Sequence, residues 1–254
     1  GHLQGEIAAQ LAVDTIKECF SRETSPRLAN TRTFLGAALH HAHESIVRYA
    51  AECKIPPHAA PRTTCIACVV QDGQATWAHA GDSRLYLVHG HGVLHTRDHT
   101  LVQRMVDEGT LSQEQAARHP LRNRVFSCLG GSAEPQIDIS EPAPLRDGDL
   151  IALCTDGAWS PLGDSMATEL ARRPLTTTVP SVLDAAERAA GPDADNLTLI
   201  AMRWHPSHAA TPDAGDDGAN SGTGDIPQFS NEDIERAVAE IRRRTPYSPS
   251  GARQ

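Results

Sequence analysis

Apolar residues recur with helical spacing through the beginning of the chain. Residues 5–20 place their apolar side chains broadly on one side of a helix, and a polar break containing Pro26 follows. A longer apolar stripe then repeats at steps of four, three, four, three and four residues, and it consists of Leu35, Leu39, Ala42, Ile46, Tyr49 and Cys53. We therefore predict two amphipathic helices, each with one buried face.

The spacing changes after a proline-containing segment at residues 56–61. Residues 64–70 are apolar and β-branched, and an Asp-Gly turn separates them from the mainly apolar residues 75–80. A glycine-containing turn likewise joins residues 85–88 to residues 93–96. These patterns predict two β-hairpins, and the tight turns favour antiparallel pairing because a parallel neighbour requires a long crossover.

Helix and strand signals continue as far as residue 204. We predict helices at 100–108, 112–118 and 181–190, and strands at 136–140, 149–154 and 196–204. The order of helices, hairpins, further helices and strands favours an α+β layered sandwich.

The composition changes at residue 205. Residues 205–229 are mostly small, polar, glycine or proline residues, which predicts a flexible linker. Residues 230–245 begin with acidic residues, carry an apolar edge and contain consecutive arginines near their end, as a short amphipathic helix would. We therefore expect one folded domain over residues 1–204, followed by the linker, the helix and a disordered tail at 246–254.

The charge balance of the 254-residue chain excludes some functions. Its net charge is −9 at pH 7. A chain without excess positive charge binds phosphate backbones and anionic lipids poorly, so we expect neither nucleic-acid nor membrane binding. No apolar run approaches the roughly 20 residues of a membrane span, and we expect no secretory signal.

Two groups of potential metal ligands are expected to be structural instead. Cys65 and Cys68 have the spacing of a zinc knuckle, but no second ligand pair follows, and residues three apart on a strand face opposite sides. His40, His41 and His43 project from the second predicted helix at angles that do not all converge, which indicates exposed or rim positions rather than metal ligands. The six cysteines are scattered along the chain, which favours free thiols and the cytoplasm.

Three aspartates stand where predicted strands meet turns. Asp82 follows a glycine between the two hairpins, Asp156 follows the apolar strand at 149–154, and Asp195 precedes the last strand. A single aspartate in such a place is usually a turn residue. Three converging carboxylates, however, would suit a hard, oxygen-preferring divalent ion such as Mg²⁺ or Mn²⁺.

Six short motifs occur in a definite order along the chain. They are Gly-Asp-Ser-Arg at 81–84, Asp-His-Thr-Leu-Val at 98–102, His-Pro-x-Arg-Asn at 119–123, Leu-Gly-Gly at 129–131, Thr-Asp-Gly at 155–157 and Asp-Asn-Leu-Thr at 195–198. In this order they resemble the bacterial metal-dependent phosphatases of type 2C, the PPM family, over about residues 1–204. Several motifs in the right order are a far more specific signal than any one of them.

The resemblance implies a fold, a reaction and roles for the three aspartates. The family fold is a sandwich of two antiparallel β-sheets flanked by helices. Its members hydrolyse phosphoserine and phosphothreonine with two Mg²⁺ or Mn²⁺ ions, which activate a water for direct attack on phosphorus. Asp156 and Asp195 match the aspartates that bind the core metal pair. Asp82 matches an aspartate that, with the equivalent of Asp156, holds a third and weaker ion in many bacterial members.

The resemblance also implies a substrate-binding segment. Residues 110–131, called the flap below, match a mobile segment that borders the active site and contacts substrate, and Arg122 and Asn123 are the flap residues expected to do so. The implied substrates are phosphorylated proteins, either a bacterial serine/threonine kinase or its targets. We expect the chain to act as a monomer.

Two departures from the family pattern leave alternatives open. Ser160 stands where many members have an acidic residue four places after Asp156, which counts against a third ion. The family's Asp-Gly-x-Gly-Gly-His motif and an upstream phosphate-binding arginine are represented here only by Gly1 and His2, so we expect an N-terminally incomplete chain. The alternatives are a catalytically impaired phosphatase-like domain that binds partners, and a two-metal hydrolase of small phosphoesters.

Overall fold

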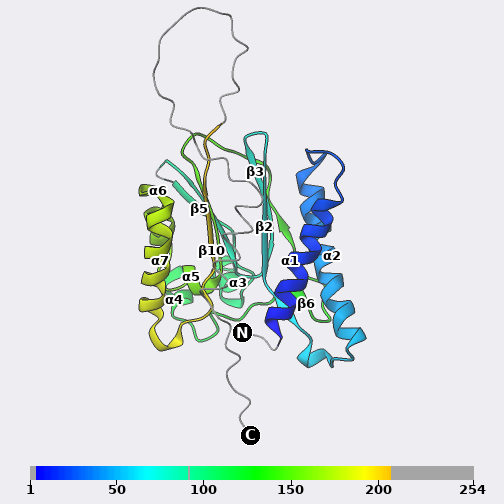
Figure 1. Cartoon of the computed structure of the whole chain (residues 1–254). Coiled ribbons are helices and arrows are strands. Elements are labelled where there is room, and N and C mark those ends of the chain that lie inside the picture. Colours follow the sequence, from blue (N-terminus) through cyan, green and yellow to red (C-terminus); the bar gives the residue numbers. More distant parts are fainter. Residues whose placement is uncertain (1–3, 91, 207–254) are drawn as a thin grey trace, which may run out of the picture. The chain divides into compact units, whose positions relative to one another are not determined.

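The computed structural model describes residues 4–90 and 92–206, and Figure 1 shows their course. The predicted helix at 230–245 and the tail at 246–254 lie outside the described residues, as does the predicted linker beyond residue 206. Residues 1–207 form one compact unit by their internal contacts.

The described residues form groups of helices and groups of strands that follow one another along the chain. The helices are α1 (Gly5–Ser21), α2 (Thr31–Glu52), α3 (Leu101–Asp107), α4 (Gln113–Ala117), α5 (Asp156–Trp159), α6 (Ser165–Arg172) and α7 (Leu175–Ala190), with 3-10 turns at Pro57–Ala59 and Gly191–Asp193. The strands are β1 (Arg62–Thr63), β2 (Cys65–Gln71), β3 (Gln74–Ala80), β4 (Arg84–His89), β5 (Gly92–His95), β6 (Leu129–Gly130), β7 (Asp138–Ile139), β8 (Ala143–Pro144), β9 (Leu150–Cys154) and β10 (Leu199–Arg203). Within the described ranges, no helix combines the length and the apolar character needed to cross a membrane.

The strands form two main antiparallel sheets. One has the order β2-β3-β7, with β8 also paired to β3, and the other has the order β10-β9-β4-β5. A short third pairing joins β1 to β6. Both predicted hairpins, β2-β3 and β4-β5, are present, so the predicted antiparallel pairing is confirmed.

The two sheets pack face to face between helical layers. Helices α1 and α2 cover the β2-β3-β7 sheet, and α6 and α7 cover the other sheet (Figure 1). Between the sheets, Ala75, Leu85 and Ile151 are buried. Because strand side chains alternate between faces, each sheet contributes to this central core and to a second core under its helices. The predicted α+β sandwich of two antiparallel sheets flanked by helices is confirmed.

The apolar stripe of α2 forms the core on one side. Its members Leu35, Leu39, Ala42 and Ile46 are fully buried. The stripe ends sooner than predicted, because Tyr49 is half-buried and Cys53 is exposed. The helix therefore buries only the part of its stripe that faces the sheet.

Of the three α2 histidines, which were predicted at exposed or rim positions rather than as ligands, His43 is buried. His40 and His41 are exposed, but His43 is buried, and its Nδ1 accepts a hydrogen bond of 3.1 Å from the Gly130 amide. The reason is that His43 lies next to the apolar stripe and finds a backbone donor from a strand far away in sequence.

The second half of the structure contains more helix than the sequence pattern predicts. Helix α7 begins at Leu175, six residues before the predicted start, and continues through Pro180. Helices α5 and α6 were not predicted. Neither α6 nor α7 has a side-chain cap, so the usual start signal is absent, and burial of apolar residues such as Leu170 and Val182 stabilises them instead.

Strand β2 separates the two cysteines of the zinc-knuckle-like spacing. Cys65 packs toward the helical side of its sheet, whereas Cys68 packs toward the opposite sheet. Burial raises the pKa of the Cys65 thiol to about 12 and that of Cys68 to about 11. The two thiols therefore act as apolar core groups rather than as a metal pair, as predicted.

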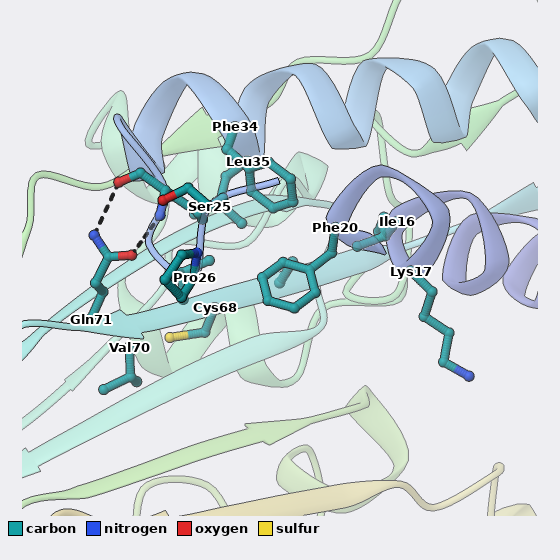
Figure 2. Close-up of a pocket in the computed structure, with 13 residues that line it drawn as sticks. Ile16, Lys17, Phe20, Ser25, Pro26, Phe34, Leu35, Cys68, Val70 and Gln71 are labelled. Atoms are coloured by element: carbon teal, nitrogen blue, oxygen red, sulfur yellow. Dashed lines mark hydrogen bonds between the residues drawn. The ribbon is translucent and has the colours of Figure 1, made fainter. Parts of the chain in front are cut away.

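An apolar groove runs along β2, which pairs only with β3 among the described residues. The groove has a volume of about 450 Å³, and Figure 2 shows Phe20, Pro26 and Phe34 beside the strand. Five consecutive β2 residues, 67–71, line it. Since neighbouring strand residues face opposite sides, the groove lies against the open edge of the strand. None of the aspartates identified in the sequence lines this groove.

Candidate functional site

The strand register brings the three candidate aspartates to the same end of one sheet. Cys154, the last residue of β9, pairs with Arg84 at the start of β4 and with Leu199 at the start of β10. Asp156 lies two residues beyond this pairing and Asp82 lies two residues before β4. Antiparallel pairing therefore places these two aspartates beyond the same edge.

The loops that carry Asp156 and Asp195 touch through their backbones. A Cβ atom added to Gly157 would lie 2.6 Å from the carbonyl oxygen of Asn196, so only glycine permits this approach. The Thr155 hydroxyl donates a 3.1 Å hydrogen bond to the same oxygen. The residues next to Asp156 and Asp195 are thus held together. The strand ends therefore limit the separation of the two aspartates.

The environment of the aspartates disfavours their ionised forms. Asp82 is 7% exposed, and burial, followed by the negative charges of Asp156 and Asp98, raises its pKa to about 7. Burial and then the charge of Asp195 raise the pKa of the half-buried Asp156. Asp195 itself is exposed. A divalent cation would stabilise carboxylates that repel one another in a partly buried place. The carboxylate oxygens are hard donor atoms, which such cations prefer.

A buried ion pair lies beside the aspartates. Arg84 makes two hydrogen bonds to the Asp98 carboxylate, of 2.8 and 2.9 Å, and its guanidinium stacks 3.4 Å above the Trp159 ring. The Trp159 indole in turn donates a 3.0 Å hydrogen bond to the carbonyl oxygen of Asp82. The sequence motifs contain Asp82, Arg84 and Asp98, and Trp159 lies two residues after the 155–157 motif. The contacts among these residues link separate motifs and could not be read from spacing.

The flap residues Arg122 and Asn123 line a small cavity of about 150 Å³ next to this ion pair. Arg84, Trp159 and Ser160 line the same cavity. The flap includes α4, where the Ser112 side chain and Gln115 form a reciprocal capping box. The structure thus joins the predicted substrate-contacting residues to the aspartates through Trp159, which touches both the cavity and the Asp82 peptide.

A second group of potential ligands was missed in the sequence. His79 on β3, His99 after β5 and Asp138 on β7 bring one donor atom each within 4.8 Å of one another. The sequence signals were that His99 is part of the 98–102 motif and that His79 stands two residues before the 81–84 motif.

The chain resembles known phosphatases over most of its described length. The family model described as protein phosphatase 2C matches residues 2–194. The serine/threonine phosphatase stp of Listeria monocytogenes is 28% identical over 204 residues, which are 79% of each chain. The serine/threonine protein phosphatase PstP of Mycobacterium tuberculosis is 31% identical over 204 residues, which are 79% of this chain and 38% of PstP.

Solved structures agree with this assignment. The crystal structure of the Mycobacterium tuberculosis phosphatase PstP/Ppp covers 81% of this chain and 85% of its own, with a TM-score of 0.67 and 28% identity. The PstP catalytic domain in complex with two manganese ions has a TM-score of 0.64 and 27% identity, covering 81% of this chain and 84% of its own. The family model covers most of this chain, and the TM-scores indicate the same fold. The chain therefore belongs to the protein phosphatase 2C family.

Proposed function

We propose that this chain is a metal-dependent protein phosphatase that hydrolyses phosphoserine and phosphothreonine. The observation that carries the proposal is the placement of Asp82, Asp156 and Asp195 at one end of a sheet. Burial first, and then the charge of a neighbouring aspartate, raises the pKa of Asp82 and of Asp156. Such a group is costly without a cation, and its oxygen donors fit Mg²⁺ or Mn²⁺. The manganese-bound PstP structure supports this choice of metal.

Asp156 and Asp195 would hold the core ions, and Asp82 with Asp156 a further, weaker one. Such ions, when bound, lower the pKa of a coordinated water and offset the charge of the phosphate. The protein's own contribution is to fix the donors next to the ends of paired strands, which avoids reorganisation during the reaction. Arg84 is already neutralised by Asp98, so Arg122 is the cation of the flap cavity that would meet a phosphoprotein, with Asn123 beside it.

The proposed partners are phosphorylated proteins, namely a bacterial serine/threonine kinase or its targets, met by a monomer in the cytoplasm. The family assignment supports phosphoprotein substrates. All six cysteines are free thiols, which supports a reducing compartment. We also propose that the phosphatase domain ends near Trp204 and that the linker, helix and tail follow it.

The test is phosphate release from a phosphothreonine peptide by the purified protein, with Mn²⁺ titrated in and then removed with EDTA. Activity should require Mn²⁺, and Asp156→Asn should lower it by more than the roughly 10- to 100-fold that an outer-sphere partner costs. Asp184→Asn on the exposed side of α7 is the matched control and should leave activity unchanged.

The same assay separates the alternatives. Turnover that persists in EDTA would contradict a metal-dependent mechanism. Phosphopeptide binding without release of phosphate would support a binding domain, and turnover restricted to para-nitrophenyl phosphate would support a small-molecule hydrolase.

A further inference from the structure

His99 lies at the junction of several segments that surround Asp82. Its imidazole is 2% exposed and stacks between the rings of His79 and Phe126, with centroid separations of 4.6 and 5.6 Å. Its backbone amide donates a 2.9 Å hydrogen bond to the carbonyl oxygen of Gly81, the residue before Asp82. The Phe126 amide, at the flap, donates a 2.8 Å bond to the carbonyl oxygen of His99.

The hydrogen bonds around the two histidines define their tautomers. The Gly81 amide donates to His99 Nδ1 at 3.2 Å, so the ring proton of neutral His99 is on Nε2. That Nε2 lies 3.2 Å from a carboxylate oxygen of Asp138, close enough for electrostatic attraction though not in hydrogen-bond alignment. His79 donates from Nε2 to the carbonyl oxygen of Arg97 at 2.9 Å, which leaves its Nδ1 as a buried acceptor.

These tautomers argue against a metal ion between His79, His99 and Asp138. A neutral histidine binds a metal through the nitrogen that carries no proton. On His99 that nitrogen is Nδ1, which already accepts the Gly81 amide. Binding through Nε2 would require the imidazole to give up its remaining proton or the Gly81 amide to lose its partner in a buried place.

We propose that His99 is a positioning residue, which fixes the Gly81 peptide so that the Asp82 carboxylate points at Asp156, and that Asp138 holds His99 in the required tautomer. The proposal rests on the proposed role of Asp82 as a metal ligand. His99 binds Gly81 at both its amide and its carbonyl oxygen. Trp159 binds the carbonyl oxygen of Asp82, so the peptides on both sides of the carboxylate are held.

The conformation of Gly81 explains why such restraint is needed. Its φ of 113° is in a region that L side chains rarely adopt, and an added Cβ would lie 2.4 Å from the Thr64 side chain. A glycine has more conformational freedom than any other residue, so the turn needs external contacts to hold one geometry. Asp82 is buried next to like charges, and without those contacts its carboxylate would gain free energy by turning toward water.

Two substitutions of His99 separate its two contacts. In His99→Asn the side-chain oxygen can take the place of Nδ1 and still accept the Gly81 amide, whereas in His99→Gln the amide group reaches toward Asp138 and leaves Gly81 without an acceptor. The readout is Mn²⁺ affinity measured by isothermal titration calorimetry. The Asp82→Asn variant defines the part of this affinity that depends on Asp82. We expect His99→Gln to weaken that part by about 10- to 100-fold, as loss of an outer-sphere partner does, and His99→Asn by less than about threefold.

A double variant tests whether His99 acts through Asp82. Adding His99→Gln to Asp82→Asn should weaken Mn²⁺ binding no further, because residues that act as a unit are not additive. Equal effects of His99→Asn and His99→Gln, or a further loss in the double variant, would overturn the proposal. If Asp82→Asn leaves Mn²⁺ binding unchanged, the proposed role of Asp82 fails instead, and the two failures are thereby distinguished.

Nitrogen-15 NMR of the imidazole groups gives a readout that does not depend on metal, and its first measurement needs only the wild-type protein. The wild-type protein should show His99 with its proton on Nε2, and Asp138→Ala, at a half-exposed position, should increase the population of the other tautomer. A wild-type His99 protonated on Nδ1 would overturn the proposal. So would Zn²⁺ that binds the wild-type protein stoichiometrically and is lost in His79→Ala, since that would identify the group as a metal site.

Discussion

Replacing Asp82 by asparagine should stabilise the metal-free protein at alkaline pH. Burial raises the pKa of Asp82 from its ordinary value of 3.8 to about 7, so the folded chain keeps a proton that the unfolded chain has released. Between about pH 4 and pH 7 unfolding therefore releases a proton, and the free energy of unfolding falls as pH rises. Above pH 7 both states are ionised and the penalty is complete.

The interval between the two pKa values sets the size of the effect. At 1.36 kcal/mol per pH unit, the interval from 3.8 to about 7 corresponds to about 4 kcal/mol. Asp82 is 7% exposed, so solvent screens little of this cost. The Asp82→Asn variant carries no charge there and should match the wild-type protein near pH 4 and exceed its stability by up to about 4 kcal/mol at pH 8.

Urea denaturation in EDTA, followed by tryptophan fluorescence from pH 4 to pH 8, measures this difference. Asp184→Asn serves as the control for the loss of an exposed carboxylate and should follow the wild-type curve. Saturating Mn²⁺ should then stabilise the wild-type protein more than Asp82→Asn, because the ion binds the ionised carboxylate. Parallel pH curves for wild type and Asp82→Asn would refute the reasoning.

Three further predictions concern the core and the ion pair. Asp98→Ala leaves the buried Arg84 cation uncompensated and should lower the free energy of unfolding by about 3–5 kcal/mol. A double variant with Arg84→Met should lose less stability than the sum of the two single changes. Additive values from urea denaturation would contradict this prediction. Leu39→Ala empties a fully buried site under α2 and should cost about 2–5 kcal/mol by the same assay, and a cost below 1 kcal/mol would mean that the site collapses. Cys65, with a thiol pKa raised to about 12 by burial, should resist iodoacetamide at pH 8 in the folded protein, whereas the exposed Cys53 should be alkylated, as mass spectrometry would show.

Much of the fold was predictable because its signals are local. The α2 stripe, the two hairpin turns and the apolar, β-branched character of residues 64–70 each depend on residues a few positions apart. The places where prediction failed lack such signals. Helices α6 and α7 begin without a side-chain cap, and α7 contains Pro180, so packing rather than local preference establishes them.

The candidate site was only partly predictable. Asp82, Asp156 and Asp195 could be selected because each stands at a strand end within a motif, and their role as metal ligands remains a prediction. Their electrostatic coupling was not readable, because it depends on the register in which Cys154 pairs with Arg84. A shift of that register would move the carboxylates apart.

The sequence by itself determined the first two helices, the antiparallel hairpins and the acidic residues at the strand ends, since periodicity, turn residues and motifs are properties of short segments. Only the tertiary structure decided which buried polar groups meet. It placed Arg84 between Asp98 and Trp159, and His99 between Gly81 and Asp138. The physical reason is that a buried charge or imidazole must find a partner wherever packing supplies one, and those partners lie in segments that no local pattern connects.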